Sequence, residues 1–172
     1  AAALLFMGAV FAQNTSYSNQ TGDDERVYVR QAGTNLSSAI IQGNGSGLGS
    51  HRAMVLQKGD LNASDIYQEG TNNQAYVDQF DFTPPTSASS NIYQGKNNTA
   101  SANNKARVEQ HGGTNSVATL NQDGEANEAK THQDGTDGVV NITQDGTANK
   151  SYVAQLPFYS AVGNTADIYQ TD

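Results

Sequence analysis

The side chains that could support catalysis or hold a metal ion are three histidines and 17 acidic residues, since the 172-residue chain has no cysteine. The histidines are His51, His111 and His132, and they occur in unrelated local contexts. None has a second histidine at the spacing that joins metal ligands on a helix. We therefore expect surface histidines, no metal site and no cofactor.

Catalysis would require carboxylates or a base that converge in a cleft. The acidic residues are instead scattered along the chain, so the sequence does not indicate an enzyme. Asp123, Asp134 and Asp145 do recur regularly, and a ladder of these carboxylates could attract Ca²⁺. A soluble ligand- or calcium-binding β-solenoid is therefore an alternative function, although the glycine-rich nonapeptide of calcium-binding β-rolls is absent.

Charge and composition limit the class of protein further. The chain has 9 basic and 17 acidic residues and a formal net charge of -8, which disfavours nucleic acid or anionic lipid as a partner. Its hydrophobic content of 35% is low for a conventional globular core. We expect no nucleic-acid partner, no membrane insertion, and a fold held together by something other than a large apolar interior.

The first twelve residues, AAALLFMGAVFA, differ from the rest of the chain. This apolar run suits the hydrophobic region of a signal peptide and is too short to span a bilayer. We interpret 1–12 as a partial signal peptide, 13–25 as a polar segment outside the repeat, and 26–172 as a repeat domain. A buried N-terminal helix is the alternative for the first segment.

A repeat marked by glutamine dominates the chain. Eleven of the twelve marker glutamines have an aliphatic residue two positions earlier, and all twelve have Ser, Ala or Val four positions earlier. A period of two places these three residues on one side of a β-strand, so we predict about twelve short strands with one buried face. The markers are Gln31, Gln42, Gln57, Gln68, Gln79, Gln94, Gln110, Gln122, Gln133, Gln144, Gln155 and Gln170.

Glycine and asparagine mark the turns and the strand starts. Glycine lies two residues after the marker wherever the next marker follows within 11 or 12 residues, as expected if a tight turn needs a positive φ. These residues are Gly33, Gly59, Gly70, Gly112, Gly124, Gly135 and Gly146. Asparagine lies six residues before a marker, where its amide can form a ladder as the glutamine amide does and where it also tolerates a turn conformation. These residues are Asn62, Asn73, Asn104, Asn127, Asn149 and Asn164. The longer segments carry loop-like insertions that begin at Gly43, Asp81 and Leu156.

The repeat predicts an all-β fold, a flattened β-solenoid of about six two-strand coils with a cross-β, amyloid-like interior. Stacked coils place identical side chains above one another at a spacing of roughly 4.8 Å. A glutamine amide then donates to one neighbouring coil and accepts from the other, so a buried polar column stays hydrogen-bonded. A meander of hairpins offers no such pairing.

These residues resemble the curlin repeat, Ser-x5-Gln-x-Gly-x2-Asn-x-Ala-x3-Gln, of bacterial curli subunits. Two segments match every specified position between the glutamines: Gln68, Gly70, Asn73, Ala75 and Gln79, and then Gln122, Gly124, Asn127, Ala129 and Gln133. The resemblance covers about residues 27–170. It departs from the pattern in its insertions, in Gly138 where asparagine is expected, and in a leading serine found only at Ser116.

The resemblance implies a secreted subunit of an extracellular, curli-like functional amyloid fibre on the bacterial cell surface, active in biofilm matrix, adhesion and aggregation. Its implied partners are further copies of itself, a nucleator subunit and an outer-membrane secretion channel, to which 13–25 would target the chain. We expect head-to-tail polymerisation of the major subunit. The minor nucleator is the alternative, which the acidic C-terminal residues disfavour.

Overall fold

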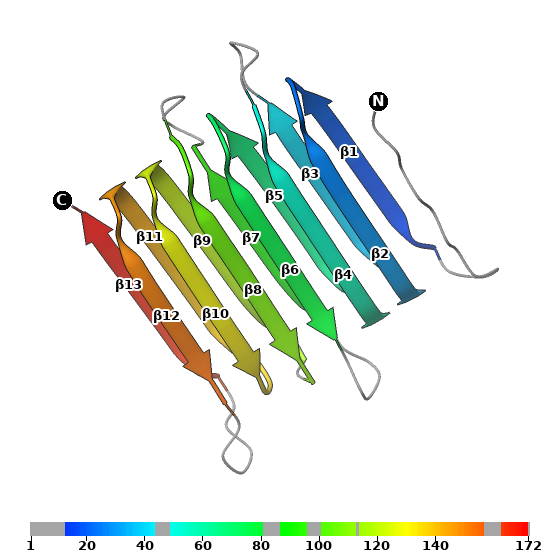
Figure 1. Cartoon of the computed structure of the whole chain (residues 1–172). Coiled ribbons are helices and arrows are strands. Elements are labelled where there is room, and N and C mark those ends of the chain that lie inside the picture. The colour runs from blue at the N-terminus through cyan, green and yellow to red at the C-terminus, as the bar shows by residue number, and fades with distance from the viewer. Residues whose placement is uncertain are drawn as a thin grey trace.

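Consecutive strands alternate between two parallel sheets that lie face to face in this computed structural model, which describes residues 13–43, 49–80, 87–95, 101–112, 114–156 and 163–171 (Figure 1). One sheet has the order β1-β3-β5-β7-β9-β11-β13 and is called sheet A here; sheet B has the order β12-β10-β8-β6-β4-β2. The strands of sheet A are β1 (Thr15–Thr21), β3 (Ser37–Gly43), β5 (Ala63–Glu69), β7 (Ala88–Gln94), β9 (Ser116–Glu125), β11 (Val139–Thr147) and β13 (Thr165–Thr171). Those of sheet B are β2 (Arg26–Thr34), β4 (Arg52–Asp60), β6 (Gln74–Phe80), β8 (Lys105–His111), β10 (Glu128–Asp134) and β12 (Lys150–Gln155).

Each strand buries alternate residues, as its period of two requires. In β5, Ser64, Ile66 and Gln68 are buried, whereas Asp65 and Tyr67 lie on the outer face. The largest core side chains of sheet A form a column of Ile40, Ile66, Ile92, Leu120 and Ile142. A column of Val55, Val77 and Val108 lies in sheet B. The predicted β-solenoid is confirmed.

Register is uniform along the stack. Every pairing of neighbouring strands that reaches a marker position sets glutamine on glutamine, for example Gln42 on Gln68 and Gln133 on Gln155. The number of residues between markers does not disturb this register: Gln68 pairs with Gln94 across 26 residues just as Gln122 pairs with Gln144 across 22. The strands β2 to β13 pair off in sequence order into the two-strand coils that the repeat predicts.

The thirteenth strand, β1, was not expected. Residues 13–25 were interpreted as a polar segment outside the repeat, yet Thr15–Thr21 forms a parallel strand along β3 in full register. Its inward residues are Ser16, Ser18 and Gln20, so it keeps the small residue and the glutamine but lacks the aliphatic residue. Gln20 is therefore also a marker glutamine. The sequence pattern did not include it, because Ser18 stands two positions earlier where the pattern has an aliphatic residue.

The glycines serve close packing as well as backbone conformation. All seven lie at positive φ, but Gly33, Gly59, Gly124 and Gly146 lie inside strands rather than at the chain reversal. A Cβ atom on Gly124 would stand 2.1 Å from the carbonyl oxygen of Gly146 in the next coil. Only glycine therefore allows these backbones to stack.

The left-handed residue of the turn is the one before the asparagine, a correction to the sequence interpretation. Leu61 and Asn72 have φ values of 61° and 55°, and each precedes a strand-start asparagine. The asparagines that follow are buried and serve another purpose, described below.

Some expectations fall outside the described residues. These are the partial signal peptide at 1–12 and most of the inserted residues, at 44–48, 81–86, 96–100 and 157–162. Among the described residues, none belongs to a helix with the length and apolar character needed to cross a bilayer.

Candidate assembly surfaces

Two columns of glutamine amides run through the interior of the stack. In sheet A, Nε2 of each glutamine donates to Oε1 of the next along Gln20, Gln42, Gln68, Gln94, Gln122, Gln144 and Gln170, at 2.8–3.0 Å. In sheet B the same bonds, at 2.8–3.0 Å, join Gln31, Gln57, Gln79, Gln110, Gln133 and Gln155. Each column therefore has a direction, with donors facing the C-terminal coils.

From Gln31 to Gln170, the second N–H of each marker amide crosses to the opposite sheet. Nε2 of Gln68 donates to the Arg52 carbonyl at 3.3 Å, and Nε2 of Gln57 donates to the Ser37 carbonyl at 2.9 Å. An inner rung thus uses both donors and its acceptor, which removes the cost of burying a primary amide. The glutamines consequently tie the coils to one another and the two sheets together.

A third column lies where the strands of sheet B begin. The Oδ1 atom of each asparagine accepts the backbone N–H of the residue stacked on it, from Asn73 to Asn104, Asn127 and Asn149, at 2.9 Å. These asparagines therefore hold successive turns together. Two of the six predicted asparagines, Asn62 and Asn164, lie instead at the opposite edge, where sheet A begins.

The opposite edge has a mixed column, in which only some of the positions are asparagine. Asn62 accepts from the Ala88 N–H at 3.0 Å and Asn14 accepts from the Leu36 N–H at 3.0 Å. The positions between and beyond them hold Leu36, Ala88, Ser116 and Gly138. A continuous asparagine column therefore forms where the strands of sheet B begin and not where those of sheet A begin.

His51 is buried in the asparagine column, contrary to the expected surface position. It has no exposed area, and its Nδ1 accepts the Asn73 N–H at 3.2 Å. Below it, Glu25 Oε2 accepts the His51 backbone N–H at 3.1 Å. Burial lowers the pKa of His51 below its ordinary value of 6.5 and raises the pKa of Glu25 above 4.5. A neutral imidazole thus replaces an asparagine amide.

Other site residues were missed for related reasons. His51 follows Gln42 by nine residues instead of the usual five because an insertion precedes it, so its place in the column was not visible. Gln20 could have been found from Gly22, which follows it by two residues as in the other segments. His111 and His132 come together on the outer face of sheet B, a proximity that only stacking produces.

The acidic series does not form the expected ladder. Asp123 stacks on Asp145 in sheet A, but Asp134 belongs to sheet B and stacks on His111. The three carboxylates therefore cannot share one calcium ion, which weakens the alternative of a calcium-binding solenoid.

The comparison with known families agrees with this geometry. Residues 52–80 match the family model of the curlin associated repeat. The chain contains a curlin-associated repeat. The matched segment comprises β4, β5 and β6, and so includes the glutamine rungs Gln57, Gln68 and Gln79. No curated protein and no solved structure matches the chain. The curlin repeat and the β-solenoid point to a structural protein rather than an enzyme.

Truncation of one inner rung should destabilise the whole stack. In Gln68→Ala, the Gln42 donor and the Gln94 acceptor lose their partners, at about 1–3 kcal/mol for each buried group. The matched control is Gln74→Ala, because the Gln74 side chain is exposed; we expect a change within about 0.5 kcal/mol. Guanidinium unfolding monitored by circular dichroism measures both, and equal midpoints for the two variants would contradict the ladder.

Protonation of His51 should weaken the fold. The unfolded histidine binds a proton below about pH 6.5 while the folded one resists it, so the His51 contribution to stability falls as the pH drops through and below 6.5. Glu25 has the opposite effect: because its folded pKa is raised, its contribution to stability falls as the pH rises above about 4.5. In His51→Asn, an amide oxygen can accept the Asn73 N–H at every pH. We expect its unfolding free energy to fall less than that of the wild type between pH 7 and pH 5, and parallel curves would refute this role.

Proposed function

We propose that the chain is the structural subunit of an extracellular curli-type amyloid fibre and that it polymerises head to tail through the ends of its solenoid. The carrying observation is that the strands at the two ends have matching inward residues. Val27, Val29 and Gln31 of β2 correspond to Ser151, Val153 and Gln155 of β12. The inward residues of β2 could therefore continue the columns that end at β12.

The number of strands determines how such ends meet. Sheet A has seven described strands and sheet B has six. Stacking complete thirteen-strand units would leave sheet B one strand short at every junction. Without β1 the unit has six strands in each sheet, and β12 and β13 of one subunit meet β2 and β3 of the next. We infer that β1 covers the edge of β3 until a neighbouring β13 displaces it.

The residues of β1 suit a temporary cover. Ser18 lies over Ile40 of β3, whereas β13 would place Ile168 in that column. Burying an aliphatic side chain contributes about 1.5–3 kcal/mol that serine does not supply. The exchange also preserves the glutamine bond, because Gln170 takes the rung of Gln20 above Gln42.

The outer face of sheet B supports the same register. Tyr28 on β2 and Tyr152 on β12 occupy equivalent positions and are 45% and 61% exposed. In a junction between β12 and β2 they become neighbours, so both rings lose exposed apolar surface and can stack. These exposed rings are consistent with an interface that forms only in the fibre.

Secretion and the further partners rest on the resemblance alone. We propose that 1–12 belong to a signal peptide, that 13–25 are recognised by an outer-membrane channel, and that a nucleator starts the fibre. Biofilm adhesion belongs to the same proposal. By resemblance, a nucleator would carry basic residues in its terminal repeat. We favour the major subunit, because β13 carries Asp167 on its outer face instead of a basic residue.

Intersubunit cross-linking tests the junction. The chain has no cysteine, so Tyr28→Cys and Tyr152→Cys chains can be mixed, assembled and oxidised. In register the two Cα atoms lie roughly 4.8 Å apart, within reach of a disulfide, and we expect a covalent dimer. Arg30→Cys is the control: it is displaced by two residues, and its Cα then lies beyond the roughly 7 Å limit.

The fibre itself supplies a second readout. An axial repeat of roughly 29 Å corresponds to six strand spacings and to displacement of β1, whereas roughly 34 Å corresponds to seven. Persistence of the chain as a compact monomer at micromolar concentration would overturn the fibre function. Fibres that cross-link equally with both partners would overturn only the register.

Strengthening β1 should delay assembly. In Ser18→Ile, the aliphatic column extends over Ile40, so β1 binds more tightly and we expect a severalfold longer lag. The matched control is Asn19→Ile, which adds the same side chain to the exposed outer face. Thioflavin fluorescence at equal concentrations measures both lags. A lag for Ser18→Ile equal to or shorter than that of the control would show that β1 does not obstruct the end.

A further inference from the structure

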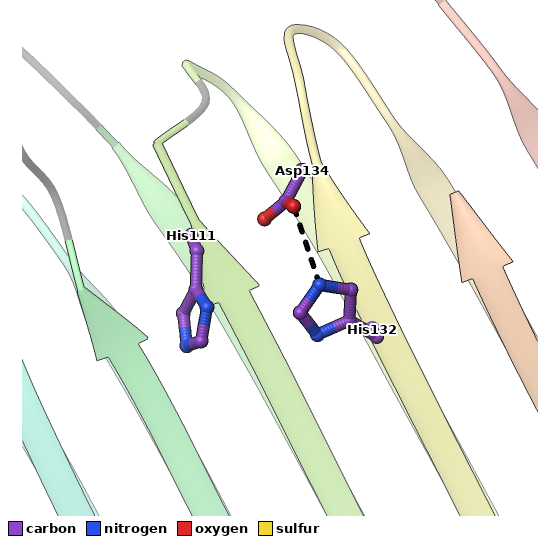
Figure 2. Close-up of side chains that lie close together, drawn as sticks. All are labelled: His111, His132 and Asp134. Carbon is purple, nitrogen blue, oxygen red and sulfur yellow. Dashed lines mark hydrogen bonds and ion pairs between the residues drawn. The ribbon is translucent and has the colours of Figure 1, made fainter. Parts of the chain in front are cut away.

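Two imidazoles and a carboxylate converge on the outer face of sheet B. His111 ends β8, and His132 and Asp134 lie on the adjacent strand β10 (Figure 2). One potential ligand atom from each residue lies within 4.8 Å of the other two. The coils bring them together because Asp134 pairs with His111 across the strands, and His132 lies on the same outer face two residues earlier.

Two polar atoms of this cluster lack a partner. The His111 Nε2 and the Asp134 Oδ1 are both buried from solvent without a hydrogen bond. The nearest counter-charge to the former is Asp78 Oδ2, at 4.0 Å. A buried donor or acceptor without a protein partner is costly, so the unpartnered Asp134 Oδ1 favours a bound cation at this cluster.

The surroundings orient His132 as in metal sites. Its Nε2 lies 3.3 Å from Asp134 Oδ2 and faces the cluster, while its Nδ1 lies 3.4 Å from Glu109 Oε2. A carboxylate that accepts the far N–H of an imidazole fixes the tautomer and strengthens the other nitrogen as a ligand.

Two cations hold Glu109 beside His132. Its carboxylate forms ion pairs with Arg107 and, at 3.3 Å, with Lys130.

We propose that His111, His132 and Asp134 form a binding site for a divalent transition metal ion, with Zn²⁺ as its simplest occupant. Two imidazoles and one carboxylate suit Zn²⁺, Cu²⁺ or Ni²⁺ and do not suit Ca²⁺ or Mg²⁺. Ligands about 2.1 Å from a tetrahedral ion lie roughly 3.4 Å apart, so small side-chain rotations close the site. Water completes the coordination.

The site joins two successive coils, which distinguishes it from a motif in the unfolded chain. His111 and His132 are separated by a complete coil in the sequence and meet only when β8 and β10 pair. The ion therefore binds the folded chain in preference to the unfolded one and stabilises the stack. This site lies within one chain and does not depend on the proposed fibre.

Titration of the folded full chain with Zn²⁺ alone tests the site. Calorimetry should show one equivalent per chain, and a raised guanidinium midpoint should accompany it. His111→Gln and His132→Gln should each weaken binding at least tenfold. The matched control Asp123→Asn removes a carboxylate at the equivalent repeat position in sheet A and should leave binding unchanged, whereas Asp134→Asn should weaken it.

X-ray absorption of the Zn²⁺-loaded wild-type chain keeps the test independent of variant folding. Two imidazoles in the first coordination shell are expected. Binding that survives in the double variant His111→Gln/His132→Gln, equal affinity of the urea-unfolded chain, or a shell of oxygen alone would overturn the proposal.

Discussion

The amide–amide hydrogen bond between stacked glutamines is the interaction on which the rest of the structure depends. A buried primary amide has two donors and an acceptor to satisfy, and a β-strand interior offers few ways to do so. Here the rung above, the rung below and a carbonyl of the opposite sheet supply all three partners, as at Gln68. This arrangement works only if every coil places its glutamine directly over the last one. Uniform register follows from that condition.

The turns must also preserve this register. The chain must leave one sheet, reverse, and start the next strand at a fixed height, and Asn104 illustrates how this is secured. Its Oδ1 accepts the Asn127 N–H of the following coil, while its own N–H donates to Asn73. Gly124 and Gly146 allow the backbones to approach where a Cβ atom would collide. Longer connections leave this pattern intact, because Gln79 still pairs with Gln110 across 31 residues.

The parts of the fold that repeat locally were predictable, and the parts that depend on neighbouring coils were not. The inward set Ser64, Ile66 and Gln68 follows from a period of two, and stacking follows from the repetition of that set. His51 could not be placed, because nothing in its local sequence shows that an imidazole substitutes for an amide. The cluster of His111 and Asp134 joins residues 23 positions apart, a distance that becomes meaningful only once coils and register are known.

The features that specify the fold are also those on which the proposed fibre depends. A column of donors and acceptors has no natural end, because each added rung satisfies the one before it and exposes an equivalent one. β1 shows how a chain can limit this. It keeps Gln20, which satisfies the polar column, but places Ser18 where the apolar column requires an aliphatic side chain. At that edge the Gln42 amide keeps its hydrogen bond, but Ile40 gains no aliphatic neighbour. In the proposed fibre, such a strand protects β3 while leaving a strand with isoleucine, such as β13, the stronger partner.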